Sequence, residues 1–220
     1  LGNTDKFVLY LDEARRMGLT VLPPDVNKSQ AIMTVVDDRT IRCGLGVIKN
    51  VGLSAIDSII EARMARGGSF GTIEDLCRDV DLRLVNRKVF ESLIKAGACD
   101  SMGLSRAALL ARLDQATEEA ASAQKDRVRG QMTFFDALKG EPAPPASNGP
   151  LSAPMRDWPE SQKLAFEKAL LGFYVSGHPL ARHEKMLKTL ATATSQQLLQ
   201  SPEGGVEVVG GMLTKIKHTT

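Results

Sequence analysis

Apolar residues recur at helical spacing over most of the chain, and this pattern predicts a mainly helical protein. In residues 4–17 they fall on one side of a helix that Gly18 is placed to end. Residues 19–46 differ, because two prolines accompany short β-prone runs, so we expect extended chain that ends in a strand or hairpin around Asp37 and Asp38. These two carboxylates are candidate catalytic groups, but turn statistics favour a polar hairpin loop.

A helix, a glycine turn and a second helix occur twice in residues 41–113. In the first copy, GLGVIKNVGLSAIDSIIEARMARGG, the turn is KNVG, and Ser54 and Asp57 have the spacing of a capping box. The glycine and basic residues that close its second helix follow the order that the helix dipole favours. The buried face of that helix is expected to comprise Ile56, Ile59, Ile60 and Met64.

The second copy, NRKVFESLIKAGACDSMGLSRAALLARL, follows the same plan. Asn86 is placed to cap its first helix and Ser105 to open the next, while Thr72 caps a short helix between the copies. The turns IKNVG and IKAGA correspond, since Ile48 and Ile94 lie 46 positions apart (94 minus 48). An internal repeat is a stronger signal than one hairpin. The buried stripe of the first helix is expected to be Val89, Phe90, Leu93 and Ile94.

Each turn is a candidate contact for a nucleic-acid backbone. A glycine turn that leads into a helix leaves backbone N–H groups without partners, the helix dipole adds positive charge, and glycine lets a phosphate oxygen approach. Such contacts carry no sequence information. A hairpin that only packs is the alternative for one copy, and the duplication favours DNA binding. The candidate DNA-binding residues are Lys49, Asn50, Val51, Gly52, Ser54, Lys95 and Gly97.

The chain changes character after these repeats. Residues 114–130 are polar on nearly every side of a helix. The segment GQMTFFDAL, residues 130–138, stands between this run and five prolines in residues 142–154, a composition typical of a linker. Helical periodicity resumes at Trp158, where we expect a new domain, and a strand pattern begins at Val206.

Composition and charge narrow the class of function. The 220 residues, 43% of them hydrophobic, suffice for one large or two small domains. The 28 basic and 26 acidic residues leave a net charge of +2, so any phosphate contact is local rather than spread over a basic coat. No apolar run approaches the roughly 20 residues of a membrane span. The three cysteines form no CxxC pair or even set, and without a signal peptide we expect a cytoplasmic location.

Apart from Asp37 and Asp38, for which a turn is favoured, the sequence offers no candidate catalytic residues, metal site or cofactor site. His178, His183 and His218 lack the spacing of metal ligands, and no Gly-rich phosphate loop or nucleophile elbow occurs. The first residue is not Met, and the strand pattern near the other end has no following strand to pair with. These features indicate a piece of a longer protein.

Four blocks in order closely resemble the alpha subunits of bacterial DNA polymerase III, the replicative C-family polymerases: MGLTVLPPDVN, IRCGLGVIKNVG, VNRKVFESLIKAGACDSMG and LGFYVSGHPL. The resemblance covers nearly the whole chain. It implies a mainly α fragment with a tandem helix-hairpin-helix domain that binds product duplex, flanked by the end of the fingers region and the start of an OB-fold. The implied divisions are 1–40 for the end of the fingers, 41–117 for the tandem hairpins, 118–157 for a linker, 158–205 for a helical lead-in and 206–220 for the first OB-fold strand.

The resemblance also implies a function for the two phenylalanines in the linker. This family carries a peptide that binds the sliding clamp, with the pattern Gln, aliphatic, Ser or Asp, Leu, Phe. The residues in those places are Gln131, Met132, Thr133, Phe134 and Phe135, and Phe134 departs from Leu by its size. A linker that packs its phenylalanines onto its own domain is the alternative.

The partners implied are double-stranded DNA, the sliding clamp and other subunits of the polymerase III holoenzyme. The acidic residues that hold Mg²⁺ in the parent polymerase would lie upstream of Leu1. Two rival interpretations are an error-prone paralogue of the alpha subunit and a non-catalytic DNA repair or recombination scaffold with tandem helical hairpins. An upstream set of acidic residues able to hold two metal ions would separate a polymerase from such a scaffold.

Overall fold

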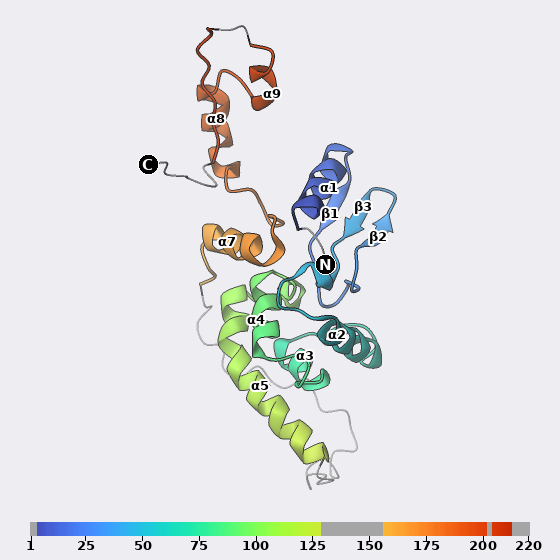
Figure 1. Cartoon of the computed structure of the whole chain (residues 1–220). Coiled ribbons are helices and arrows are strands. Elements are labelled where there is room, and N and C mark those ends of the chain that lie inside the picture. Colours follow the sequence, from blue (N-terminus) through green and yellow to red (C-terminus); the bar gives the residue numbers. More distant parts are fainter. Residues whose placement is uncertain (1–3, 129–155, 202–203, 213–220) are drawn as a thin grey trace, which may run out of the picture. The chain divides into compact units, whose positions relative to one another are not determined.

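The computed structural model describes residues 4–128, 156–201 and 204–212, and it is mainly helical with one small sheet, as predicted (Figure 1). The chain forms two compact units, Leu1–Val175 and Ser176–Thr220. The helices are α1 (Thr4–Arg16), α2 (Leu53–Ala65), α3 (Ile73–Asp79), α4 (Arg87–Lys95), α5 (Arg106–Val128), α7 (Glu160–Leu171), α8 (Glu184–Leu190) and α9 (Ser195–Leu198). The strands are β1 (Thr20–Leu22), β2 (Thr34–Asp37) and β3 (Thr40–Arg42), and short 3-10 helices span Leu45–Val47, Asp100–Met102 and Ala181–His183.

The sheet lies between α1 and the helical core in sequence and has the order β1-β3-β2. Strand β3 pairs antiparallel with β2 and parallel with β1, so the predicted hairpin is present and gains a third strand. The Asp37 carboxylate accepts the N–H of Arg39 (2.9 Å), which lowers the pKa of Asp37 and identifies it as a turn residue. Helix α1 ends as predicted, at Gly18 with a φ of 80°.

Helices α2 to α5 share one hydrophobic core. The predicted caps are present, since Thr72 accepts the N–H of Asp75 and Asn86 accepts the N–H of Val89. The predicted stripe of α4 is buried, as are Ile48 and Ile94 at the equivalent positions of the repeat. These hydrophobic contacts come from segments far apart in the sequence and fix how the two hairpins pack together.

Two predictions about α2 are wrong. Ser54 does not cap the helix, because the chain is already helical at Leu53 and Gly52 stands at the N-cap without a side-chain bond. Met64 is 72% exposed, and Arg63 is buried in its stead. The guanidinium of Arg63 is satisfied there, because Nη1 donates to the carbonyl oxygens of Val26 (2.9 Å) and Ser29 (2.8 Å).

The boundary predicted between residues 157 and 158 is also displaced. Helix α7 belongs to the first unit, which extends to Val175. Leu164, Leu171 and Phe173 are buried, and the Phe173 ring lies 5.6 Å from the ring of Phe7 in α1. A helix with such an apolar face is stable when that face packs against a neighbour. Here the neighbours are α1 and the helical hairpins of α2 to α5, which we call the hairpin domain.

The second unit is small, and its described part contains α8, α9 and a 3-10 helix. The strand predicted from Val206 is not formed in residues 206–212. Val208 bonds to Thr192 through its N–H (2.9 Å to Oγ1) and its carbonyl (2.9 Å), yet no continuous ladder follows among the described residues. A strand is stabilised by hydrogen bonds along a neighbouring segment, and here only Val208 is paired in this way. His178 opens a turn, since its Nδ1 accepts the N–H of Leu180 (3.2 Å) and its carbonyl accepts the N–H of Ala181 (2.9 Å).

Candidate nucleic-acid interface

The first turn, residues 49–52, joins the 3-10 helix Leu45–Val47 to α2. Asn50 adopts a left-handed conformation, with a φ of 68°, which Asn tolerates better than most residues. Its Nδ2 donates to Oγ of Ser92 in α4 (3.3 Å), and this bond ties the first turn to the second copy of the repeat. The side chain of Val51 points into the core, whereas Lys49 and Gly52 are exposed.

The N-terminus of α2 is open. Within the described ranges, no acceptor lies within hydrogen-bonding reach of the N–H groups of Gly52, Leu53 and Ser54. Gly52 has an ordinary extended conformation, and a Cβ added to it would meet no atom within 4 Å. Exposed amides, a helix dipole and a nearby lysine together form a suitable contact for a phosphate group. The first turn therefore leaves the leading amides of α2 open beside the exposed Lys49, and Leu53 is a further exposed residue there.

The second turn, residues 95–98, is built differently. Gly97 has a φ of 84°, and Gly97 and Ala98 donate their N–H groups back to Ile94 (3.0 Å) and Leu93 (2.9 Å), so this glycine ends α4 in a Schellman motif. A Cβ at Gly97 would overlap Nη2 of Arg106 and lie 2.8 Å from its Cζ. The space beside the Cα of Gly97 is thus filled by the side chain of Arg106 and is closed to a phosphate group.

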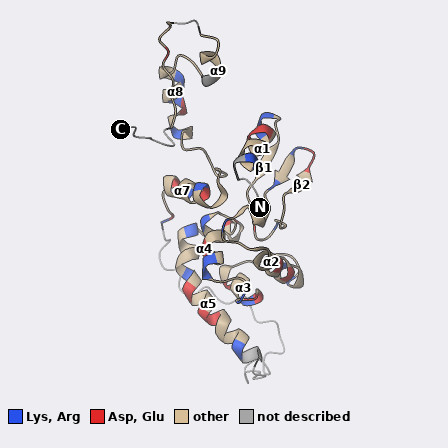
Figure 2. Ribbon diagram, viewed as in Figure 1, with Lys and Arg blue, Asp and Glu red and all other residues tan. Residues whose placement is uncertain are grey.

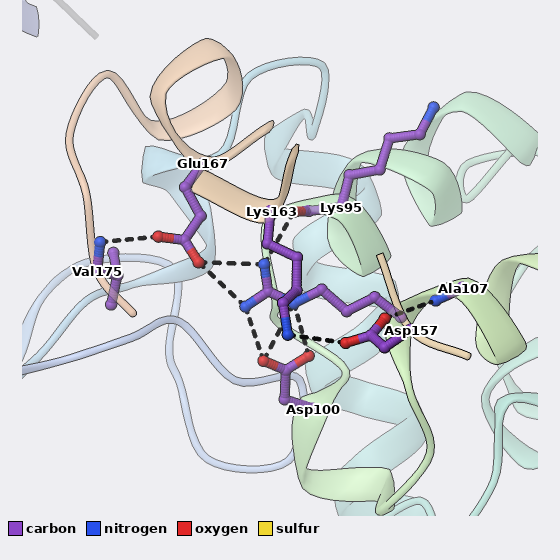
Figure 3. Close-up of polar contacts among 8 residues, drawn as sticks. Lys95, Asp100, Ala107, Asp157, Lys163, Glu167 and Val175 are labelled. Atoms are coloured by element: carbon purple, nitrogen blue, oxygen red, sulfur yellow. Dashed lines mark hydrogen bonds and ion pairs between the residues drawn. The ribbon is translucent and has the colours of Figure 1, made fainter. Parts of the chain in front are cut away.

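The helix after the second turn starts late and its first amides are partly used. A 3-10 helix intervenes before α5 begins at Arg106. Oγ of Ser105 accepts the N–H of Ala108 (3.2 Å), and Oδ1 of Asp157 accepts the N–H of Ala107 (3.4 Å). A hydroxyl and a carboxylate therefore accept amides at the start of α5, whereas the leading amides of α2 are open; the contact between Asp157 and Ala107 is drawn in Figure 3.

The two candidate lysines differ in the same way. Lys49 is exposed, and its backbone N–H donates to the carbonyl of Leu170 (2.9 Å) while its side chain stays at the surface. Nζ of Lys95 lies 3.2 Å from Oε2 of Glu91 and 5.6 Å above the ring of Phe166. The side chain of Lys95 thus already has partners within its own domain. Figure 2 shows both basic and acidic positions along the helices of the two hairpins.

Other candidate chemistry is sparse in the described residues. Cys43, Cys77 and Cys99 are free and buried, and burial raises the pKa of Cys43 to about 11 and that of Cys77 to about 12, which disfavours the reactive thiolate. The described ranges contain no cluster of three or more His, Cys, Asp or Glu residues suited to a metal ion. In the same ranges no helix is long and apolar enough to cross a membrane. The predicted clamp peptide, residues 131–135, lies outside the described residues.

Two buried charged residues, Glu167 and Arg63, were not predicted from the sequence. Glu167 is fully buried in α7, three positions after Leu164 and four before Leu171, so it lies on the apolar face of that helix. Arg63 likewise lies four positions after Ile59 on the apolar face of α2. A charged residue at a core position of an amphipathic helix was the available signal in both cases.

Comparisons with known proteins agree with this geometry. A family model described as a helix-hairpin-helix motif matches residues 18–109. The chain is 39% identical over 198 residues to the DNA polymerase III subunit alpha of Vibrio cholerae, covering 90% of this chain and 16% of that protein. For the Escherichia coli K12 protein of the same name the identity is 40% over 188 residues, covering 86% of this chain and 16% of that protein.

The subunit alpha of Haemophilus influenzae is 37% identical over 213 residues, which cover 97% of this chain and 18% of that protein. The chain thus spans between 16% and 18% of the length of these three relatives. Nearly all of it takes part in the similarity, including the helices on both sides of the motif. The chain is therefore similar over nearly its whole length to one segment of the DNA polymerase III alpha subunits.

Proposed function

We propose that this chain is the part of a replicative DNA polymerase that binds the product duplex through its backbone and connects the enzyme to a sliding clamp. The first turn is the observation that carries the duplex contact, because it joins open amides at the start of α2 to an exposed lysine. The polymerase assignment rests on the relatives, whose name states that activity. Nucleotidyl transfer with Mg²⁺ would belong to the remainder of the parent protein, as would contacts with other holoenzyme subunits.

The chemistry of the first turn suits a duplex of any sequence. Backbone amides and a lysine bind phosphate oxygens, which are the same at every base pair. The near neutrality of the chain, with a net charge of +2, implies that such binding is weak and local. Affinity should fall as salt rises, because each phosphate contact releases counterions.

A titration of short duplexes with the whole chain tests this function. Lys49→Glu places a negative charge at the first turn and should weaken binding by about tenfold or more, which corresponds to roughly 1.4 kcal/mol. The exposed Lys185 of α8 provides a matched charge reversal, Lys185→Glu, in the other unit. Duplex binding that depends on base sequence, or that survives Lys49→Glu unchanged, would contradict the duplex contact.

The clamp contact is proposed from the sequence of residues 131–135. Gln131 would hydrogen-bond at the polar end of a groove on the clamp, while Met132, Phe134 and Phe135 enter its apolar part. Each buried side chain contributes roughly 1.5 to 3 kcal/mol before the cost of ordering the peptide, so micromolar affinity, about 8 kcal/mol, is expected. A short tether raises the local concentration of the clamp and supports processive synthesis.

A double substitution separates this contact from packing within the chain. Gln131→Ala with Phe135→Ala should abolish binding to purified clamp, while the melting temperature and the duplex affinity stay as in the unmodified chain. If clamp binding persists and the melting temperature falls, the phenylalanines belong to the protein's own core and the clamp function is lost.

A further inference from the structure

Helix α7 contacts the hairpin domain at both turns, although the helix-hairpin-helix match ends at residue 109. At its C-terminal end, the carbonyl of Leu170 accepts the N–H of Lys49 in the first turn (2.9 Å). In its middle, the ring of Phe166 lies under Nζ of Lys95 beside the second turn (5.6 Å). One rigid helix of 12 residues is thus bonded to two turns that lie 46 positions apart in the repeat.

A polar cluster, buried at Arg106 and Glu167, fixes α7 in this place. We call Asp100, Arg106 and Glu167 the Arg106 cluster; Asp100 and Glu167 are drawn in Figure 3. Both terminal nitrogens of Arg106 donate to Oε1 of Glu167 (3.1 Å each), and its Nη2 also donates to Asp100 (2.8 Å). Burial disfavours the charged guanidinium, but the two carboxylates more than offset this and raise the pKa of Arg106.

Glu167 connects α7 to several segments at once. Its side chain is fully buried, and Oε2 accepts the N–H of Val175 (2.9 Å). Arg106, which it holds, also donates to the carbonyl of Lys95 (3.3 Å). The carboxylate of Glu167 is therefore hydrogen-bonded directly to the start of α5, at Arg106, and to the chain after α7, at Val175. Through Arg106 it is also connected to the end of α4, at Lys95. Loss of its charge would loosen the helix that carries the Leu170 carbonyl.

We propose that α7 is part of the duplex-binding surface as a positioning element, and that Glu167 is the residue that holds the first turn in place through it. Glu167 itself touches no phosphate. It fixes α7 on α4 and α5, and α7 in turn fixes the Lys49 amide, so the open N-terminus of α2 keeps a set position relative to the second hairpin. This inference rests on the proposed duplex binding and names the residue that makes the surface rigid.

The test compares Glu167→Gln with Leu76→Ala in the whole chain. Gln keeps the shape of Glu and removes the charge, whereas Leu76→Ala opens a cavity in α3, which packs on α2 and α5. Three quantities are measured below the melting temperature: amide exchange at Lys49, duplex affinity, and the slope of log affinity against log salt. A loss of stability alone leaves that slope unchanged, because it reports the number of phosphates bound by the folded protein.

Glu167→Gln is expected to speed exchange of the Lys49 amide, to weaken duplex binding about fivefold to tenfold and to reduce the salt slope by about one. Leu76→Ala is expected to leave the duplex affinity and the salt slope as in the unmodified chain, and to speed exchange at Lys49 no more than at other amides of the same core. Should Glu167→Gln fail to fold, Phe166→Leu removes the ring beneath Lys95 from a half-buried position and takes its place.

The inference is overturned if both variants behave alike, or if Lys49 exchange accelerates while affinity and slope do not change. A different result reports on the proposed function itself. If the unmodified chain does not bind duplex, or Lys49→Glu binds as well as it does, duplex binding fails whatever α7 does. The exchange measurement needs no DNA, so it still shows whether Glu167 holds the first turn.

Discussion

The two turns of the repeat have similar sequences and opposite surroundings. In the first, α2 begins directly after the turn, its leading amides are open and Gly52 faces free space. In the second, Gly97 ends α4 and packs against Arg106, and α5 begins only after a 3-10 helix. A repeated sequence pattern therefore predicts a repeated packing unit, but it does not by itself predict two equal binding surfaces.

The difference arises from which residue adopts the left-handed conformation. It is Asn50 in the first turn and Gly97 in the second, and these lie 47 positions apart, one more than the offset of the repeat. In the first turn this leaves Gly52 extended and α2 free to start at once. In the second turn the left-handed glycine completes a Schellman motif, which returns two amides to α4 and turns the glycine inward.

The largest expected effect comes from placing the same substitution in both turns. Gly97→Val should lower stability by about 3 to 5 kcal/mol, because a β-branched residue is strained at a φ of 84° and displaces Arg106 from its buried partners. Gly52→Val should cost less than about 1 kcal/mol, mainly through a poorer N-cap. Chemical denaturation of both variants measures the difference. Similar losses for the two would show that the turns are equivalent after all.

A smaller effect is expected when each lysine is truncated and duplex binding is measured. Lys49→Ala should weaken binding about threefold to tenfold and reduce the salt slope by about one, as expected for one phosphate contact. Lys95→Ala should weaken duplex binding less than Lys49→Ala does. The ammonium group of Lys95 is already paired with Glu91 and lies over the ring of Phe166. Equal losses from both lysines would mean that Lys95 leaves these partners to bind phosphate and that both turns contribute.

Much of the fold was predictable because it depends on local patterns. The caps at Thr72 and Asn86, the stripe of α4 and the hairpin at Asp37 follow from residue type and spacing alone. The start of α2 was misplaced because two capping residues, Ser54 and Asp57, compete with a turn whose geometry Asn50 sets. Local patterns do not report which turn conformation wins.

Long-range contacts explain what the sequence could not predict at the candidate site. The place of α7 depends on Glu167 meeting Arg106, which lies 61 positions earlier. The proline-rich composition between Arg106 and Glu167 predicted a domain boundary. The burial of Leu164 and Leu171 instead shows that α7 packs with the helical hairpins in one unit. The resemblance to a polymerase family suggested a function for the turns, and only the structure showed that their surroundings differ.

The smallest expected effect concerns pH at the start of α5, where Asp157 occupies the position that is open in α2. Burial raises the pKa of this carboxyl, but hydrogen bonds from Lys163 and from the N–H groups of Trp158 and Ala107, together with the charge of Lys163, lower it overall. A carboxyl with a lowered pKa stabilises the folded state above its ordinary pKa of about 3.9 and loses that contribution as the pH falls through the folded value. Asp157→Asn should therefore reduce stability by less than about 1 kcal/mol near neutral pH, because the ion pair is partly exposed.

That difference should shrink when the pH falls below about 4, since Asp157 then becomes neutral in the unmodified chain as well. Denaturation of the unmodified chain and of Asp157→Asn at a series of pH values isolates this contribution from the other carboxyls, which titrate identically in both. The corresponding substitution at the other hairpin, Gly52→Asp, places a carboxylate at the open N-cap of α2, where it should stabilise the helix and weaken duplex binding. A difference that stays constant across acid pH would show that Asp157 acts only through its shape, and the contrast between the two helix starts would then not be electrostatic.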